Sequence, residues 1–221
     1  AIMPMIILTC LASKLSNKQV IWVEDRLEHL TAASSATGRL TKLRASINEK
    51  GLIEALDYDQ IDDVGAYPRA PEPASLYRMH GNLSGAYKVK NIRCRNRVVL
   101  TNKTPSGLNR GFGGPQHYFA LERLVHQIAV ELDLNVLDVI KVNLLEKKQF
   151  PYKSPSGALL DSGDFQKLVR KVVKSSTYKN ILKKKNNAIK NGKIYGIGYS
   201  AIIEPSISNM GYVTTALPYK D

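Results

Sequence analysis

Seven residues in the middle of the chain have the composition of an anion-binding loop. They read Arg110-Gly111-Phe112-Gly113-Gly114-Pro115-Gln116 and stand directly before a run with helical periodicity from His117 to about Leu132. Glycine lets a backbone take positive φ and come close to a ligand, and the first turn of a helix offers unpaired N–H groups at the positive end of its dipole. The sequence therefore predicts a loop that cradles an anionic group.

The elements around this loop are predicted from hydrophobic spacing. A strand is expected at Arg97 to Asn102, followed by a turn that contains Pro105 and Gly107. The helix that follows the loop has apolar residues at the spacing of one buried face: Phe119, Leu121, Leu124, Val125, Ile128 and Ala129. A short second helix is expected at Val136 to Val142.

The N-terminal part is predicted to contain a helix at Pro4 to Ser16, a strand at Val20 to Val23 and a second helix near Leu27 to Ala33. The apolar run at its start has no basic leader and is too short to span a bilayer, so the first helix is expected to be buried. Neither export nor membrane insertion is indicated, and we expect a cytoplasmic protein.

A β-hairpin is predicted next along the chain. Residues Arg39 to Ile47 alternate polar with apolar side chains, Asn48 to Gly51 supplies a turn, and Leu52 to Tyr58 forms the return strand. A proline-rich connection, Pro68 to Pro73, follows.

The net charge of +13 is concentrated near the C-terminus, where the stretch from Lys167 to Lys193 holds ten basic residues and no acid. Four apolar residues give it a broken helical period: Leu168, Val172, Ile181 and Leu182. Two short amphipathic helices interrupted near Ser175-Ser176 are therefore expected, followed by a glycine-punctuated strand at Ile194 to Ile203. The basic stretch has three interpretations: a solvated lysine face, a contact with an acidic partner, or a nucleic-acid site that lacks aromatic residues for stacking.

Composition, with 43% hydrophobic and 23% charged residues in 221, indicates a globular segment of α+β class with mixed sheets and packed helices. We divide it into residues 1–68 (helix, strand and hairpin), 74–150 (glycine loop and helix) and 151–221 (lysine-rich helices and terminal strand). Two cysteines, Cys10 and Cys94, are too few for a disulfide framework or an iron–sulfur cluster.

Clusters of acidic residues elsewhere match no metal pattern. Glu24, Asp25 and Glu28, with His29 nearby, fit a helix N-terminus, where acids complement the dipole. The aspartates within residues 57–63 lack the glycine and the terminal glutamate of a calcium loop, so a solvated turn is expected there.

Several blocks of the chain together resemble the large subunit of molybdenum hydroxylases, the family of xanthine dehydrogenase, aldehyde oxidoreductase and aerobic carbon monoxide dehydrogenase. The blocks stand in this order: Val23 to Arg26, Gly65 to Tyr67, Gly85 to Arg93, Thr101 to Pro105, Arg110 to Gln116, Ala120 to Glu122, Asn143 to Leu145, Ser162 to Phe165 and Tyr195 to Tyr199. Family subunits are several times longer than 221 residues. The chain is therefore expected to be an internal segment, a natural split subunit, a truncation or a relic, without the upstream cofactor loop and the downstream half that carries the catalytic glutamate.

The resemblance implies a molybdenum–pterin cofactor, either molybdopterin or its cytosine dinucleotide, with iron–sulfur centres and FAD on partner subunits. Arg110, Gly111 and Gly113 match residues that hold the cofactor, and Phe112 and Arg78 match residues that face the substrate. No catalytic residue and no metal ligand is assigned within this chain.

The implied reaction is oxidation of a small substrate with oxygen from water. Carbon monoxide dehydrogenases carry Cys-Ser-Phe-Arg where this chain has Leu108 to Gly113, and no cysteine stands there. An aldehyde or heteroaromatic substrate is therefore preferred. Glu122 matches a family acidic residue and is interpreted as a buried hydrogen-bonding partner, whereas His117 is a candidate contact for a cofactor phosphate.

Three classes of function remain open at this point. The first is a cofactor-binding segment that is inactive alone and completed by the other molybdopterin-binding segment. The second is an inactive relic or assembly module that docks partner subunits, and the third is a basic nucleic-acid-binding domain with steeply salt-dependent affinity. Exposed apolar surface on the segment also predicts self-association.

Overall fold

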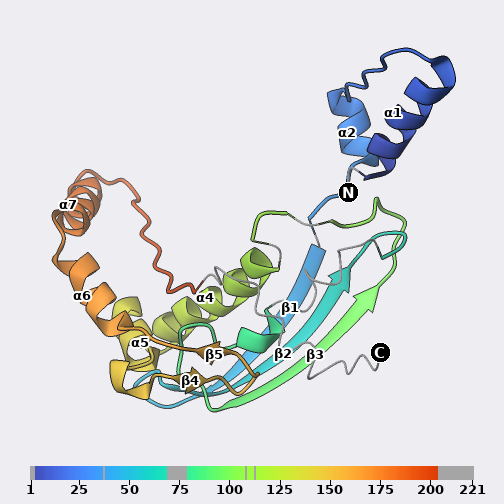
Figure 1. Ribbon diagram of the computed structural model, residues 1–221. Helices are drawn as coiled ribbons and strands as arrows, with labels where there is room; N and C mark the ends of the chain where they lie inside the picture. The colour runs from blue at the N-terminus through green and yellow to red at the C-terminus, as the bar shows by residue number, and fades with distance from the viewer. Residues whose placement is uncertain (1–2, 37, 69–78, 108, 112, 204–221) are drawn as a thin grey trace.

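The structure is a computed structural model that describes residues 3–36, 38–68, 79–107, 109–111 and 113–203. Its centre is a three-stranded sheet in the order β1-β2-β3, with helices packed on one face (Figure 1). β1 (Gly38–Ile47) pairs antiparallel with β2 (Ile53–Asp63), which confirms the predicted hairpin. β3 (Asn91–Val99) pairs parallel with β2 and begins six residues before the predicted strand. The fold is thus α+β, as expected.

Two helices cover the inner face of the sheet. α4 (Gly114–Glu131) begins three residues earlier than predicted, and α5 (Val136–Asn143) follows it after a short turn. Their buried side chains meet the inward side chains of β2 in one core, which includes Leu56, Tyr58, Leu121, Val125 and Ile140. The apolar spacing in the predicted helix therefore identified its buried face, apart from Phe119, which is exposed.

Asn143, at the end of α5, ties this helix to the turn of the hairpin. Its Oδ1 accepts a hydrogen bond from the amide of Ile53 at 2.8 Å, and its Nδ2 donates to the carbonyl of Gly51 at 2.7 Å. The side chain is buried, so these bonds replace strand partners that the turn residues lack.

The outer face of the sheet is a ladder of opposite charges. The carboxylate of Asp57 on β2 accepts hydrogen bonds from Arg44 on β1 and from Arg93 on β3. These bonds, with Arg93 the stronger influence, hold the pKa of Asp57 well below its usual value. The aspartates of residues 57–63 thus belong to a strand, and the predicted solvated turn was wrong. The sequence did contain a signal for this strand, because residues 57–63 place an aspartate at positions 57, 59 and 63, which is the period of two expected for one face of a strand.

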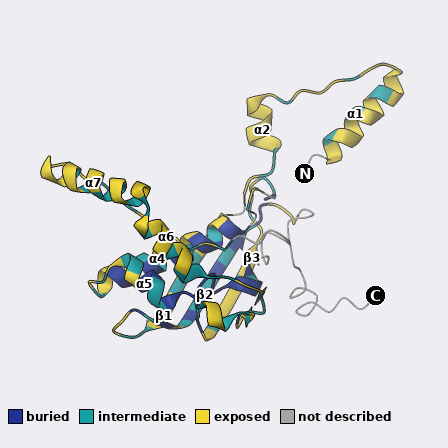
Figure 2. Cartoon of the chain, turned by 60° about the vertical axis from the view of Figure 1, so that its left-hand side comes forward, coloured by how far each residue is buried: buried dark blue, intermediate teal, exposed yellow. Residues whose placement is uncertain are grey.

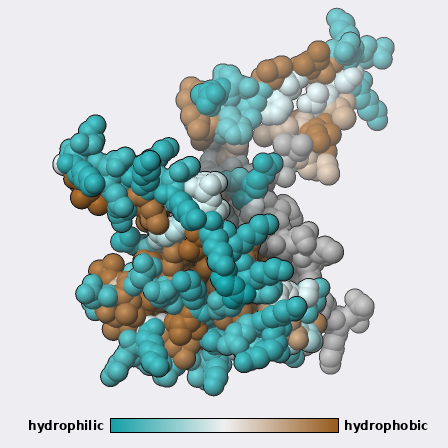
Figure 3. Space-filling view, turned by 90° about the vertical axis from the view of Figure 1, so that its left-hand side faces the viewer, coloured by the Kyte–Doolittle hydropathy of each residue, from teal (hydrophilic) through white to brown (hydrophobic). Residues whose placement is uncertain are grey.

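The N-terminal helices stand apart from the sheet. α1 (Met3–Ser16) and α2 (Arg26–Ala32) match the predicted helices, but neither has a buried residue, so the expected burial of the first helix was wrong (Figure 2). Val20 to Val23 forms no strand and is largely exposed. Apolar side chains therefore cover much of this region's surface (Figure 3).

The acidic cluster at the start of α2 is a helix cap. Oδ1 of Asp25 accepts from the amide of Glu28 at 2.8 Å, and the Glu28 carboxylate accepts in return from the Asp25 amide at 2.9 Å. His29 Nδ1 lies 2.8 Å from a carboxylate oxygen of Glu24. The reciprocal bonds of Asp25 and Glu28 form a capping box, which satisfies two unpaired backbone N–H groups. They confirm that the acidic cluster is a helix N-terminus.

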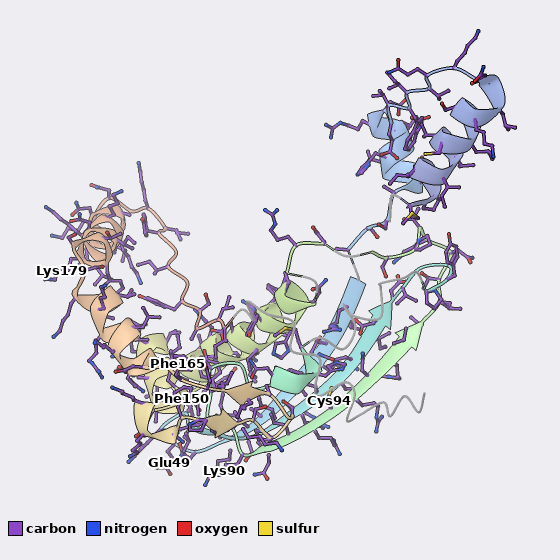
Figure 4. The ribbon with its side chains drawn as sticks, viewed as in Figure 1. Glu49, Lys90, Cys94, Phe150, Phe165 and Lys179 are labelled. Carbon is purple, nitrogen blue, oxygen red and sulfur yellow. The ribbon has the colours of Figure 1, made fainter. Side chains whose placement is uncertain are left out.

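The C-terminal part begins after α5 with short elements and ends in two helices. The short elements are η2 (Lys147–Gln149), β4 (Tyr152–Lys153) and β5 (Leu159–Leu160), while η1 (His80–Asn82) lies earlier, before β3. The rings of Phe150 and Phe165 meet edge to face with centroids 5.3 Å apart, which fixes the start of α6 (Figure 4).

The lysine-rich stretch forms α6 (Phe165–Lys174) and α7 (Ser176–Lys190), as predicted. Ser175 ends the first helix and caps the second, because its Oγ accepts from the amide of Tyr178. Basic side chains such as Lys179 point to solvent (Figure 4). Residues 194–203 form no strand in the described residues, so the predicted strand was wrong. Among the described helices, none is long and apolar enough to cross a membrane.

Candidate functional site

The glycine loop lies where α4 begins. Gly113 is the N-cap of α4 with φ 87°, and Gly111 has φ 80°, both in the left-handed region that side chains disfavour. The carbonyl of Gly111 accepts from the amide of Gly114 at 2.7 Å, which closes a tight turn. Pro115 then occupies the first turn of the helix, where its missing N–H costs nothing. The predicted handover from loop to helix is confirmed, although a turn separates it from β3.

Two crossing segments hold the loop in place. The turn after β2 and the connection after β3 share three backbone bonds, among them Ala66 N–H to Lys103 O and Thr101 N–H to Gly65 O. Gly65 has φ 76°, and a β-carbon there would overlap the carbonyl oxygen of Thr104. The amide of Gly107 donates to the carbonyl of Ser35, so the chain before β1 is attached to the same platform.

The surface of the loop suits an anionic ligand. Arg110 is exposed, and its guanidinium has no hydrogen bond or ion pair among the described residues. The amide of the buried Gly113 likewise has no partner in that part of the chain. Both residues stand directly before the N-terminus of an 18-residue helix, whose dipole favours negative charge. A loop of this composition and position is compatible with the polar atoms of an anionic cofactor.

The two residues expected to face a substrate, Phe112 and Arg78, lie outside the described residues. Of the five predicted site residues, the structure thus places Arg110, Gly111 and Gly113 together in one turn. Their roles in binding stay predictions.

His117 does not face a ligand, contrary to its candidacy as a phosphate contact. Its side chain is fully buried, stacks on Tyr58 with ring centroids 5.7 Å apart, and meets Tyr118 edge to face. Neither ring nitrogen has a hydrogen-bond partner among the residues that the structure describes. Burial, with lesser effects of Arg39 and His80, lowers the pKa of His117 to about 3, so the ring is neutral.

A polar region of the sheet surrounds this histidine, and sequence reasoning missed it. Asp62 on β2 is fully buried and accepts from Arg39 Nε on β1 at 2.6 Å and from Asn96 Nδ2 on β3 at 2.7 Å. Gln60, also fully buried, lies on the same face, and the Sγ of Cys94 is 3.8 Å from its Oε1 (Figure 4). The inner face of β2 thus changes from apolar to polar toward its C-terminal end. The signal was again the period of two in residues 56–62.

Glu122 is confirmed as a hydrogen-bonding partner. Its carboxylate accepts from the hydroxyl of Tyr87 at 3.0 Å and from the amide of Ala201 at 2.9 Å. Burial raises the pKa of Glu122, while those bonds partly oppose the shift. The side chain links α4 to two segments far apart in sequence, which is a structural role. Among the described residues, no group of three His, Cys, Asp or Glu side chains is placed to hold a metal ion.

Comparison with known proteins identifies the domain. The chain is 28% identical over 204 residues to the nicotine 6-hydroxylase large subunit of Paenarthrobacter nicotinovorans, covering 91% of this chain and 25% of that protein. It is 28% identical to the carbon monoxide dehydrogenase large chain of Hydrogenophaga pseudoflava, covering 80% of this chain and 22% of that one.

Solved structures agree. The quinoline 2-oxidoreductase of Pseudomonas putida 86 superposes with a TM-score of 0.77 at 25% identity, covering 86% of this chain and 24% of that one. The chain therefore spans about a quarter of the length of the relatives it matches. The family model described as the molybdopterin cofactor-binding domain matches residues 1–144. The chain belongs to the molybdopterin cofactor-binding domain family.

Proposed function

We propose that this chain is one molybdopterin-binding segment of a cytoplasmic molybdenum hydroxylase that oxidises an aldehyde or heteroaromatic substrate. The observation that carries the proposal is the loop of Arg110, Gly111 and Gly113 at the N-terminus of α4. Within the described residues, the Arg110 guanidinium and the Gly113 amide have no hydrogen-bond partner. The absence of a cysteine between Leu108 and Gly113 supports a substrate other than carbon monoxide.

Each loop residue has a proposed task. The guanidinium of Arg110 and the amides of Gly111 and Gly113 bind and orient the polar end of the cofactor. Phe112 and Arg78 are proposed to position the substrate. When bound, the molybdenum–pterin group supplies two-electron oxidation, in which a C–H bond and water yield a C–OH group, two protons and two electrons. We assign no catalytic base to this chain.

Partners complete the proposed enzyme. The other molybdopterin-binding segment closes the cofactor site, and subunits with iron–sulfur centres and FAD accept the electrons. The nicotine and carbon monoxide enzymes that the chain resembles are named as large subunits or large chains, which supports a multi-subunit assembly. We propose that the chain alone is inactive.

The test compares Arg110→Ala and Gly113→Ala with Arg123→Ala in the assembly purified from its own cells. Arg123 is an exposed arginine on α4, the helix that follows the loop, and it serves as the matched control. Molybdenum and pterin content, measured by mass spectrometry, should fall at least tenfold in the two loop variants and stay unchanged in the control. Equal content in all three proteins would refute the role of the loop, and an assembly without molybdenum would refute the function.

An assembly module is the second candidate. Among the described residues, no basic side chain between Lys167 and Lys193 forms an ion pair, and all the basic residues of α6 and α7 except the half-buried Lys185 are exposed. A module that docks an acidic partner through this face would bind it without molybdenum, and affinity would fall as salt is raised.

A further inference from the structure

Residues 194–203 have the exposure pattern of a strand. Their exposure alternates: residues 195, 197, 199, 201 and 203 are partly buried, and those between them are exposed. A period of two belongs to an extended chain with one face on the protein. Within the described residues the segment nevertheless joins no sheet.

One edge of this segment is occupied by side chains of α4. The amide of Ala201 donates to Oε2 of Glu122 at 2.9 Å, and Nε2 of His126 lies 2.7 Å from the carbonyl oxygen of Tyr199. The hydroxyl of Tyr118 donates to the carbonyl of Ile203. In an extended chain the N–H and C=O of one residue point the same way, and those of the next residue point oppositely. The odd-numbered residues therefore face α4.

The opposite edge is open. The N–H and C=O groups of Gly198, Ser200 and Ile202 have no hydrogen-bond partner in the part of the chain that the structure describes. A β-carbon added to Gly196 or Gly198 would meet nothing within 4 Å. Unpaired backbone groups in a row are a template for another strand.

The surroundings of the segment suit an added strand with apolar residues at every second position. Residues 197–203 form one wall of an apolar groove of about 450 Å³, and the other walls come from α5, α6 and α7. Ile140, Phe165 and Val169 are among its lining residues. An added strand continues the pleat of the first, so alternate side chains would fall on the side of Tyr199 and Ala201.

We infer that the edge of Gly198, Ser200 and Ile202 receives a β-strand from the part of the family's large subunit that lies outside these 221 residues. In the nicotine 6-hydroxylase large subunit, the region similar to this chain is 25% of the length, so most of that protein lies elsewhere. A strand from the same assembly acts at a high effective concentration, which favours it over a second copy of this chain. The inference rests on the proposed function in one respect, namely that another molybdopterin-binding segment completes this one.

Hydrogen exchange read by mass spectrometry tests the inference on two samples, the chain alone and the assembly from its own cells. In the chain alone, the amides of Gly198, Ser200 and Ile202 should exchange as freely as an unfolded peptide. In the assembly they should exchange at least a hundredfold more slowly. Fast exchange in an assembly that contains molybdenum would overturn this inference and leave the proposed function standing.

Other outcomes are also decisive. Slow exchange in an assembly without molybdenum would support the strand and refute the proposed function. Protection that appears in the chain alone and grows with concentration would identify a second copy as the occupant and overturn the inference. A chain that occurs in its cells without any other polypeptide would also overturn it.

A pair of variants separates the backbone from the side chain. Ser200→Pro removes the outward N–H and leaves the bonds of Tyr199 and Ala201 to α4. It should abolish incorporation into the assembly and leave the melting temperature of the chain alone unchanged. Ser200→Ala keeps the N–H and should assemble normally. Normal assembly of Ser200→Pro would overturn the inference.

Discussion

The imidazole of His117 stacks on the phenol ring of Tyr58 with planes inclined by 29°, and neither ring nitrogen has a hydrogen bond from the described part of the chain. A protonated ring in this position would be a buried cation beside another cation, Arg39, and that is why the pKa of His117 is lowered to about 3. The first turn of α4, directly behind the glycine loop, thus depends on a histidine that stays neutral.

Acid should destabilise the chain through this residue. In the unfolded chain the imidazole has its ordinary pKa near 6.5, so as the pH falls it binds a proton at a higher pH than in the folded chain. The stability is therefore complete above about pH 6.5 and falls by up to about 1.4 kcal/mol per pH unit as the pH drops from 6.5 toward 3. His117→Phe, which keeps an aromatic ring against Tyr58, should lose this slope in urea unfolding at pH 7, 6 and 5.

His29→Gln is the control for that experiment, because His29 is exposed on α2. It should keep the slope of the unaltered chain. His80, whose pKa is also lowered by burial, contributes in the same direction to all three proteins and cancels in the comparison. Parallel pH profiles for the unaltered chain and His117→Phe would contradict the prediction.

Arg39→Met should destabilise the fold strongly. The Arg39 and Asp62 side chains are 2% and 0% exposed, so removing the guanidinium leaves a buried carboxylate whose remaining side-chain donor among the described residues is Asn96. Loss of one partner from a buried ion pair costs about 3–5 kcal/mol, measured here as the free energy of unfolding in urea.

The matched control is Arg44→Met on the same strand. The Arg44 side chain is 76% exposed, and Asp57 keeps its bonds to Arg93, so stability should hardly change. Arg39→Met/Asp62→Leu, which removes both charges, should regain most of the loss. Similar losses in Arg39→Met and Arg44→Met would show that the burial of the first pair has no energetic weight.

Gly65→Ala should damage the platform of the glycine loop. Gly65 has positive φ, and its surroundings leave no room for a side chain. An added β-carbon would lie 2.8 Å from the carbonyl carbon of Thr104. Gly192→Ala has positive φ of 67° but nothing within 4 Å, so it should cost only about 1–2 kcal/mol for the left-handed conformation. Calorimetry should show a larger loss for Gly65→Ala, and an equal loss would mean that residues 101–106 yield easily.

The chain alone should self-associate. Leu8 and Leu11 on α1 and Val23 before α2 are exposed, and α1 buries none of its residues (Figure 3). Sedimentation velocity should show a mass that rises with concentration, and Leu8→Glu/Leu11→Glu should reduce it. Lys14→Glu, at the polar end of the same helix, should have no effect. A monodisperse monomer over a wide concentration range would contradict this.

Local sequence patterns were enough to predict most of the helices and the hairpin. The turn chemistry of Asn48 to Gly51 fixed the hairpin, the spacing in residues 117–132 fixed α4, and Ser175 marked the break between α6 and α7. The resemblance predicted the family, which the comparisons confirm. Each of these signals lies within a few residues of the feature it predicts.

What failed depended on partners far away in sequence. Val20 to Val23 has the side chains of a strand, but a strand needs a neighbour, and the described chain provides none. The burial of His117 depends on Tyr58, Tyr118 and the strand ends around them. Likewise, spacing alone gave no sign that β3 would run parallel to β2 or that Arg39 would meet Asp62.

The bonds of Asn143 to the turn of the hairpin bear on where this chain can be cut without loss. A fragment ending at residue 142 would contain every strand of the sheet and all of α4. In that fragment the amide of Ile53 and the carbonyl of Gly51 would nevertheless lose their bonds to the Asn143 side chain. The family match extends to residue 144, one residue past the point at which this lock is complete. A cut before residue 143 would therefore remove both bonds that join α5 to the hairpin turn.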